Sequence, residues 1–158
     1  MKAHHYKVNI TWTGNRGNGT SSYTAYDRNH TIQAGNKLLL PGSSDPSFRG
    51  DPTRYNPEEL LVASLSSCHM LWYLHLCAAA GVIVVEYTDA AAGVMEETAN
   101  GGGRFTEVTL FPVITLTSQE MVETADALHE KANELCFIAN SCNFPVHHKP
   151  IYKIVEQV

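Results

Sequence analysis

The strongest constraint on the fold is a long apolar stretch in the middle of the chain, with helix signals at both ends. Asn56 suits an N-cap, Pro57 suits the first helical position, and Glu59 is placed to complete a capping box. Gly81 suits the residue that ends the helix. The sequence therefore predicts a helix over residues 57–80, and its many small side chains indicate a central helix packed on most sides.

Apolar side chains recur at helical spacing in this stretch and predict which face is buried. The predicted stripe comprises Leu61, Leu65, Cys68, Trp72 and Leu76. Polar side chains interrupt the apolar run between residues 60 and 85, so we expect a buried helix and the start of a strand, not a membrane span. The interrupting residues are Ser64, Ser66, Ser67, His69 and His75.

The segment before this helix has features typical of β structure. Alternating apolar and polar residues predict a strand at 6–12, and a glycine-rich turn follows at 13–19. A hairpin is expected between residues 22–26 and 30–34, and residues 41–55 are expected to form a long loop.

The segment after the helix alternates between strands and a second helix. Thr117 is expected to begin that helix, with Glu120 completing its capping box. This order of elements predicts an α+β fold, and the length of 158 residues predicts one domain over residues 1–158. The expected strands are 82–88 and 90–97, paired with each other, then 104–117 and 151–155.

Composition and charge restrict the class of protein. Hydrophobic residues make up 44% of the chain and charged residues 17%, a balance typical of globular rather than disordered proteins. The net charge is −5 and there is no basic run, which argues against nucleic-acid binding. The first six residues lack the apolar core of a signal peptide, so we expect a cytosolic protein.

The chain has four cysteines, which are Cys68, Cys77, Cys136 and Cys142. In a reducing compartment they serve as core fillers, metal ligands or redox groups. Spacing disfavours zinc, because the six-residue separations of Cys136 from Cys142, and of two histidines in the helix, are not usual zinc clips. Cys77 lies nine residues after Cys68, on the opposite side of the helix, and is interpreted as core.

Three interpretations of Cys68 and Cys136 remain open from the residues alone. Both can fill the core, where free cysteine is common. As a nucleophile, Cys68 needs nearby positive charge to form a thiolate, and Arg16 on the glycine-rich turn or Arg49 in the long loop would supply it. The third interpretation is a cysteine hydrolase, whose other members would be His147 or His148, and Asn140.

Two segments resemble the OsmC/Ohr family of osmotically induced and organic hydroperoxide resistance proteins. The first begins N-P-E at residues 56–58 and places Cys68 ten residues after the glutamate. The second, residues 133–141 with the sequence NELCFIANS, looks like the segment that bears the second cysteine of the family, here Cys136. The order of elements also agrees over essentially the whole chain, which makes the resemblance specific.

The resemblance implies an OsmC-like fold, with antiparallel sheets around a central long helix, in an intertwined homodimer with two active sites at its interface. It also implies thiol-dependent reduction of organic hydroperoxides. Cys68 is then the peroxidatic cysteine, and Cys136 condenses with it to form a disulfide. An external dithiol, such as a lipoylated protein, would restore both thiols, and neither a metal nor a flavin is required.

In this family an arginine, paired with a glutamate, stabilises the thiolate and orients the peroxide. Glu58 matches the glutamate of the N-P-E motif. Arg49 precedes the motif, as in the OsmC branch, and is our first choice for the arginine. Arg16 lies on an early turn, as in the Ohr branch, and is the second choice, while Arg54 is nearer still in the sequence.

The chain departs from the well-known peroxidase branches at Phe137, where they usually have proline, and this places it in a less characterised OsmC-like branch. Cys142, six residues past Cys136, competes as the resolving thiol. An apolar pocket is expected to favour alkyl or lipid hydroperoxides over hydrogen peroxide. A non-enzymatic protein that binds a hydrophobic small molecule there is the alternative. The expected pocket walls are Phe48, Phe137, Trp72 and Tyr73.

Overall fold

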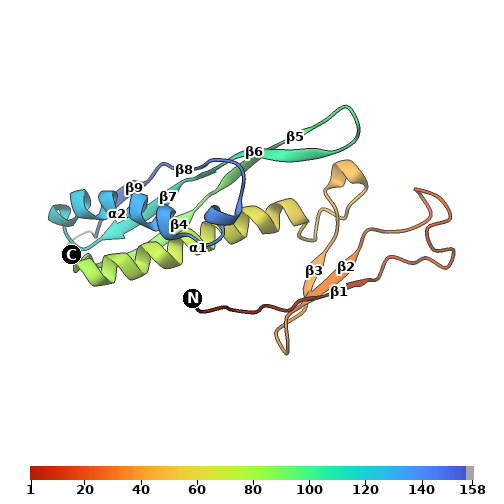
Figure 1. Ribbon diagram of the computed structural model, residues 1–158, viewed down its shortest axis with the longest axis horizontal. Coiled ribbons are helices and arrows are strands. Elements are labelled where there is room, and N and C mark those ends of the chain that lie inside the picture. Colours follow the sequence, from red (N-terminus) through yellow and green to blue (C-terminus); the bar gives the residue numbers. More distant parts are fainter. Residues whose placement is uncertain (156–158) are drawn as a thin grey trace. The chain divides into compact units, whose positions relative to one another are not determined.

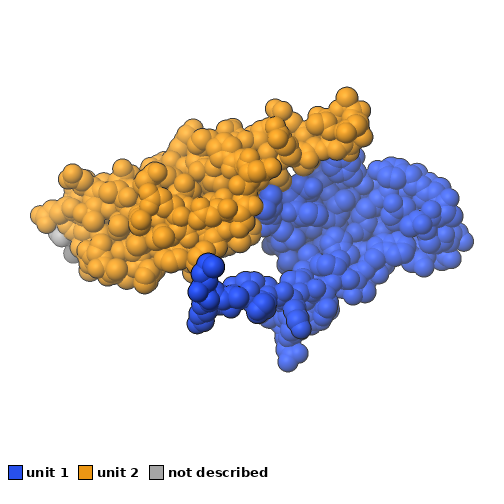
Figure 2. Space-filling view, viewed as in Figure 1, with its two compact units in different colours: residues 1–61 blue, residues 62–158 orange. Residues whose placement is uncertain are grey.

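The computed structural model describes residues 1–155 and separates into two compact units, Met1–Leu61 and Val62–Val158 (Figure 2). The boundary falls inside a long helix, α1 (Pro57–Ala80), so this helix belongs to both units. The prediction of one domain over residues 1–158 includes three residues outside the described ones and stays a prediction.

The first unit contains a small antiparallel sheet in the order β1–β2–β3. Its strands are β1 (Asn9–Trp12), β2 (His30–Gln33) and β3 (Leu40–Gly42), and the 3-10 turn η1 (Pro46–Phe48) follows them. The first two strands lie inside predicted strands, at 6–12 and 30–34. Strand β3 was not expected, because three residues that include a proline are too short to show an alternating pattern.

The predicted hairpin between residues 22–26 and 30–34 is wrong, because β2 pairs with β1 instead. Residues 22–26 form turns and carry no named strand. The indole Nε1 of Trp12, at the end of β1, donates to the carbonyl of Asp27 at 2.8 Å. This hydrogen bond ties together the two ends of the long loop that connects β1 to β2.

Helix α1 begins and ends where the sequence predicts. The Glu59 amide donates to Asn56 Oδ1 (2.8 Å), and the Asn56 amide donates to Glu59 Oε2 (3.2 Å), which is the predicted capping box. At the other end, Gly81 has a φ of 73°, a conformation that glycine adopts without steric cost. The Val82 amide donates to the Cys77 carbonyl at 2.9 Å and so completes the C-terminal cap.

The second unit has two three-stranded sheets and a second helix, α2 (Val122–Leu135) (Figure 1). One sheet has the order β4 (Val84–Asp89), β7 (Pro112–Leu116), β9 (Ile151–Ile154), and the other has the order β5 (Ala92–Glu97), β6 (Gly103–Leu110), β8 (Val146–His148). The first pair of each sheet is antiparallel and the second pair is parallel. The α+β class is therefore confirmed.

The predicted long strand at 104–117 is in fact two strands that belong to different sheets. It breaks at Phe111, because the next residue, Pro112, has no backbone N–H to donate. The Phe111 amide donates to the side chain of Asp89 (Oδ1, 2.7 Å) at the end of β4, rather than to a backbone carbonyl. As a result β4 pairs with β7 and β5 pairs with β6, and the expected pairing of 82–88 with 90–97 is wrong.

The predicted start of the second helix at Thr117 is also wrong. Ser118 caps a 3-10 turn, η2 (Gln119–Met121), by accepting a hydrogen bond from the Glu120 amide (3.3 Å), and α2 follows directly. A third 3-10 turn, η3 (Ala139–Ser141), comes after α2. The cap thus lies one residue later than expected, and the first turn is tighter than an α-helix.

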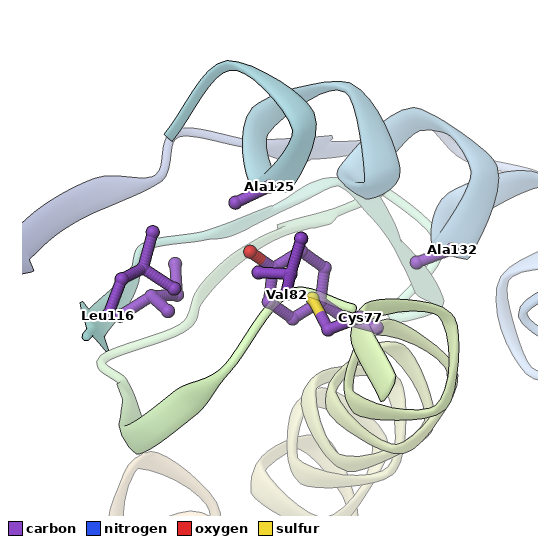
Figure 3. Close-up of a cluster of buried hydrophobic side chains, with 7 residues drawn as sticks. Cys77, Val82, Leu116, Ala125 and Ala132 are labelled. Atoms are coloured by element: carbon purple, nitrogen blue, oxygen red, sulfur yellow. The ribbon is translucent and has the colours of Figure 1, made fainter. Parts of the chain in front are cut away.

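The buried face of α1 differs from the predicted stripe. Leu65, His69, Tyr73 and Cys77 are buried, and they recur every fourth residue, so this face is offset from the predicted one. Tyr73 and Cys77 join a core cluster with residues of β7 and α2, among them Leu116 and Ala132 (Figure 3). A hydropathy pattern misses this face because two of its four members carry polar atoms.

Among the described residues, α1 is the one helix whose length and composition would allow it to cross a membrane. Its buried side chains pack in the core of the second unit, and helices of this kind in the cores of soluble proteins pass the same criterion. Only 22% of its apolar window is buried among residues 1–155, so the prediction of a helix packed on most sides is not met within one chain.

The histidines of α1 and α2 form a buried pair at the centre of this packing. His69 Nε2 and His129 Nδ1 lie 2.9 Å apart and share a hydrogen bond, and the Tyr73 ring stacks on His129 at 3.9 Å. His148 of β8 lies 5.7 Å from both rings. Burial, reinforced by the neighbouring imidazoles, lowers the pKa of His69 to about 4 and that of His129 to about 3.

We predict that acid destabilises the fold through this pair. Because the folded-state pKa values lie below the ordinary value of about 6.5, the unfolded chain takes up protons first. Stability is therefore full above about pH 6.5 and falls as the pH drops towards 4. For His69 alone, a pKa of about 4 in place of 6.5 corresponds to about 3 kcal/mol of unfolding free energy. Urea unfolding at a series of pH values measures this loss.

The combined change of His69→Leu and His129→Leu should flatten this pH dependence. His147→Gln is the matched control, because the His147 side chain is half exposed and lies beside Glu107 (3.6 Å), and it should leave the dependence unchanged. An equally steep loss of stability in the double variant would contradict the assignment to the buried pair.

Candidate functional site

The packing of α1 against the end of α2 brings the two predicted redox cysteines together. Cys68 lies on α1 beside the buried face and is partly exposed. Cys136 is the C-cap residue of α2 and is only 1% exposed. The Cys68 thiol is close enough to Cys136 to affect its pKa, and both cysteines are free. The juxtaposition that the resemblance implied is therefore present within one chain.

The surroundings of Cys136 keep its thiol protonated at neutral pH. Burial raises its pKa most, and contact with the Cys68 thiol raises it further, to about 11. The Ala139 amide donates to the Cys136 sulfur at 3.4 Å and lowers the pKa in part. Because the thiolate is the nucleophilic form of cysteine, Cys136 is a weak nucleophile at neutral pH.

Cys68 also lines an apolar pocket with a volume of about 370 Å³. The other lining residues are Leu71, Trp72, His75 and Phe137. The Trp72 ring meets Phe137 edge-on at 5.6 Å and meets His75 edge-on at 5.9 Å, with interplanar angles of 75° and 76°. Four of the five lining residues come from one face of α1, at positions i, i+3, i+4 and i+7.

Two of the four predicted pocket walls are confirmed, namely Trp72 and Phe137. Tyr73 lies in the core cluster instead, where burial raises the pKa of its phenol. Phe48 belongs to η1 in the first unit. Leu71 and His75 were not among the expected walls, although their distances of three and seven residues from Cys68 place them on its face of the helix.

Both candidate arginines lie in the first unit, around the same short segment. The Nε of Arg16 lies 3.6 Å from Asp27 Oδ1, and its guanidinium also donates to the Thr24 carbonyl. The guanidinium of Arg49 lies over the Tyr23 ring, 5.9 Å from its centroid. Arg49 has a φ of 64°, and it is the one residue other than glycine with a positive φ in the described chain. These contacts do not distinguish Arg16 from Arg49 as the predicted partner of Cys68.

The two glutamates that open α1 have different roles, as the sequence predicts. Glu59 forms the capping box with Asn56. Glu58 is partly buried, and its Oε2 is buried without a hydrogen-bond partner among residues 1–155. A buried carboxylate oxygen without a partner is costly, so this position calls for a donor such as a guanidinium.

The residues expected of a cysteine hydrolase have other partners. His147 lies beside Glu107 (3.6 Å), and the partly exposed His148 lies beside Glu130 (3.8 Å) and next to the buried rings of His69 and His129. Asn140 Nδ2 donates to the Glu134 carbonyl at 2.8 Å. None of these contacts orients a base towards Cys68, so the geometry does not favour hydrolysis.

The other two cysteines, Cys77 and Cys142, lie in different surroundings. Cys77 is buried in the core cluster, as predicted, and burial raises the pKa of its thiol. Cys142 follows η3, is partly exposed, and also has a pKa raised by burial. In the described part of the chain, no group of three or more histidine, cysteine or acidic side chains is arranged to hold a metal ion.

Comparison with known proteins identifies relatives of the whole chain. A model of the family described as OsmC-like protein matches residues 50–150. An OsmC-like protein of unknown function from Vibrio cholerae is 30% identical, with a TM-score of 0.84 over 94% of this chain and 100% of its own. No curated protein matches the chain.

Two more distant solved structures share the fold. An organic hydroperoxide resistance protein from Elizabethkingia anophelis is 24% identical, with a TM-score of 0.67 over 98% of this chain and 100% of its own. A protein from Legionella pneumophila, described as an organic hydroperoxide resistance protein and predicted redox protein, is 19% identical, with a TM-score of 0.70 over 97% and 99%. Because the family model covers more than half of the chain and the Vibrio cholerae relative covers nearly all of it, the chain belongs to the OsmC-like protein family.

Proposed function

We propose that this protein is a thiol peroxidase that reduces organic hydroperoxides through Cys68 and Cys136. The observation that carries the proposal is the proximity of the two thiols, one of which, Cys68, lines an apolar pocket. The names of the Elizabethkingia and Legionella relatives, both organic hydroperoxide resistance proteins, support the same chemistry. A pocket with apolar walls favours alkyl and aryl hydroperoxides over hydrogen peroxide, because an apolar substituent gains free energy by leaving water.

In the first step of the proposed reaction, the Cys68 thiolate attacks the distal oxygen of the hydroperoxide. The O–O bond breaks, and the leaving alkoxide takes up a proton and departs as an alcohol. Cys68 is oxidised to a sulfenic acid as the peroxide is reduced. The partly exposed Cys68 is the thiol that the substrate meets, whereas Cys136 is buried and protonated.

In the second step, the Cys136 sulfur attacks the Cys68 sulfenic acid. The S–S bond forms, the S–O bond breaks, and the hydroxide leaves with the Cys136 proton as water. An external dithiol, such as a lipoylated protein, then reduces the disulfide by exchange and is itself oxidised. We place this cycle in the cytosol, where dithiol reductants keep thiols reduced.

The proposed working unit is a homodimer, because the length of α1 separates Glu58 from Cys68. Glu58 precedes Cys68 by ten residues of one continuous helix, which is about 15 Å along the axis and beyond the reach of a glutamate side chain. A second copy of the chain would supply the glutamate and its arginine. Large apolar side chains exposed in the single chain, such as Ile10 (62%), Leu71 (63%) and Phe137 (68%), are available for such an interface.

Arg49 is our preferred arginine for this role. Arg16 already has a carboxylate partner in Asp27, whereas among residues 1–155 the ion pairs do not include Arg49. The left-handed backbone of Arg49 is costly for a residue with a side chain, and such strain is typical of functional positions. The unpartnered Oε2 of Glu58 is the acceptor that a guanidinium would satisfy.

We predict that Cys68→Ser abolishes turnover of cumene hydroperoxide with dithiothreitol as reductant, because no thiolate remains to attack the peroxide. Cys136→Ser should consume one equivalent and then stop, because the sulfenic acid cannot form its disulfide. Cys142→Ser is the matched control and should turn over at the wild-type rate. Peroxide consumption in steady state and in a single turnover measures all three. Full activity of Cys68→Ser, or loss of turnover in Cys142→Ser, would overturn the residue assignment.

We predict that Glu58→Gln lowers kcat/KM for cumene hydroperoxide by about tenfold or more, because a charged hydrogen bond to the arginine is lost. Glu59→Gln is the matched control: it weakens only the helix cap and should alter thermal stability rather than kcat/KM. Equal effects of the two substitutions on kcat/KM would show that Glu58 has no special part in the reaction.

A further inference from the structure

Tyr23 lies in the loop between β1 and β2, and its ring meets two guanidinium groups. The guanidinium carbon of Arg28 lies over the ring, 4.4 Å from its centroid, and that of Arg49 lies over it at 5.9 Å. Both distances are within the range of cation–π attraction, which extends to about 6 Å. All three residues belong to the first unit, so that unit alone defines the group.

Arg28 fixes the Tyr23 ring to the loop. Its Nη2 donates to the Tyr23 carbonyl at 2.7 Å, and its Nη1 donates to the Tyr26 carbonyl at 2.6 Å. Its guanidinium also lies over the Tyr26 ring, 4.1 Å from the centroid. Because Arg28 binds the backbone and the ring of Tyr23 together, the ring is held at a defined place in the first unit.

The backbone of Arg49 is fixed by the turn that it ends. The Arg49 amide donates to the Pro46 carbonyl at 3.0 Å, and the Gly50 amide donates to the Asp45 carbonyl at 3.1 Å. These bonds determine where the Arg49 side chain begins but do not restrain its guanidinium. Among residues 1–155, the contact that restrains the guanidinium is the one with the Tyr23 ring.

A contact through the ring face leaves the hydrogen-bonding capacity of Arg49 intact, because a cation–π contact requires none of the guanidinium N–H groups. Arg16 differs in this respect, since its guanidinium donates to the Thr24 carbonyl. Tyr23 is 59% exposed, so core packing does not account for an aromatic side chain at this position. The ring therefore restricts where the Arg49 guanidinium lies and keeps its donors available for an anion.

We infer that Tyr23 is a positioning residue for Arg49, which it holds by a cation–π contact so that the guanidinium N–H groups can bind Glu58 and the Cys68 thiolate of a second copy. The inference rests on the proposed peroxidase function, with Arg49 as its arginine. Tyr23 acts only through Arg49. Its ring lowers the conformational entropy that the long arginine side chain loses when the site forms.

The first test removes the ring and then restores it. Tyr23→Leu should lower kcat/KM for cumene hydroperoxide about two- to fivefold, the effect expected of one exposed cation–π contact. Tyr23→Phe keeps the ring and should retain the wild-type kcat/KM. Phe111→Leu is the matched control and should also behave as wild type, because the Phe111 ring meets a different cation, Lys149, at the same distance of 5.9 Å.

The second test asks whether Tyr23 acts through Arg49. Alkylation of Cys68 by iodoacetamide at pH 7 is followed by mass spectrometry of the Cys68 peptide. Because a nearby guanidinium favours the reactive thiolate, Tyr23→Leu should slow alkylation about two- to fivefold. In an Arg49→Ala background it should have no further effect. A slowing that persists without Arg49, or equal losses in Tyr23→Leu and Tyr23→Phe, would overturn the inference.

Alkylation requires no peroxide, so it separates the positioning role from the peroxidase proposal. If the wild-type protein turns over no hydroperoxide, but Tyr23→Leu slows alkylation of Cys68 only when Arg49 is present, the peroxidase proposal fails and the positioning role stands. If the protein is an active peroxidase and Tyr23→Leu matches the wild type in both assays, the positioning role is wrong and the peroxidase proposal stands.

Discussion

The packing of α1 against α2 is the interaction on which the rest of the structure depends. Its centre is the hydrogen bond between His69 and His129, with the Tyr73 ring stacked on His129 at 3.9 Å. The same contact places the C-cap of α2 against α1, and so brings Cys136 to Cys68. A buried imidazole pair has a folded-state pKa well below 6.5, so this contact is strongest when both rings are neutral.

This arrangement gives the two cysteines different chemistry although they lie close together. Cys136 is buried, and its raised pKa favours the protonated thiol. Cys68 is partly exposed and lines the apolar pocket. In the proposed peroxidase cycle, this difference in burial along one helix–helix contact makes Cys68 the thiol that reacts first.

Local signals in the sequence predicted the elements that local interactions determine. The capping box of Asn56 and Glu59 and the glycine at residue 81 placed both ends of α1 correctly. Strand pairing depends on distant partners, and there the prediction failed: a single strand was expected through Phe111, where a bond to Asp89 and the following proline divide it. The face of α1 was misjudged because His69 and Tyr73 are buried despite their polar atoms.

The sequence predicted the site residues that belong to a recognisable motif. It did not predict the residues that only tertiary packing brings to the site. Cys68 and Cys136 were assigned from two matching segments, and the structure brings them together. Predicting the pocket lining depends on helix geometry, because His75 lies on the same face of α1 as Cys68 through its seven-residue spacing.

The most direct test of the account is a peptide map of the reduced protein after one equivalent of cumene hydroperoxide. The account predicts the loss of two hydrogen atoms in the intact mass and a single bridged peptide pair that joins Cys68 to Cys136. A bridge from Cys68 to Cys142, or a protein that remains fully reduced while the peroxide persists, would contradict it.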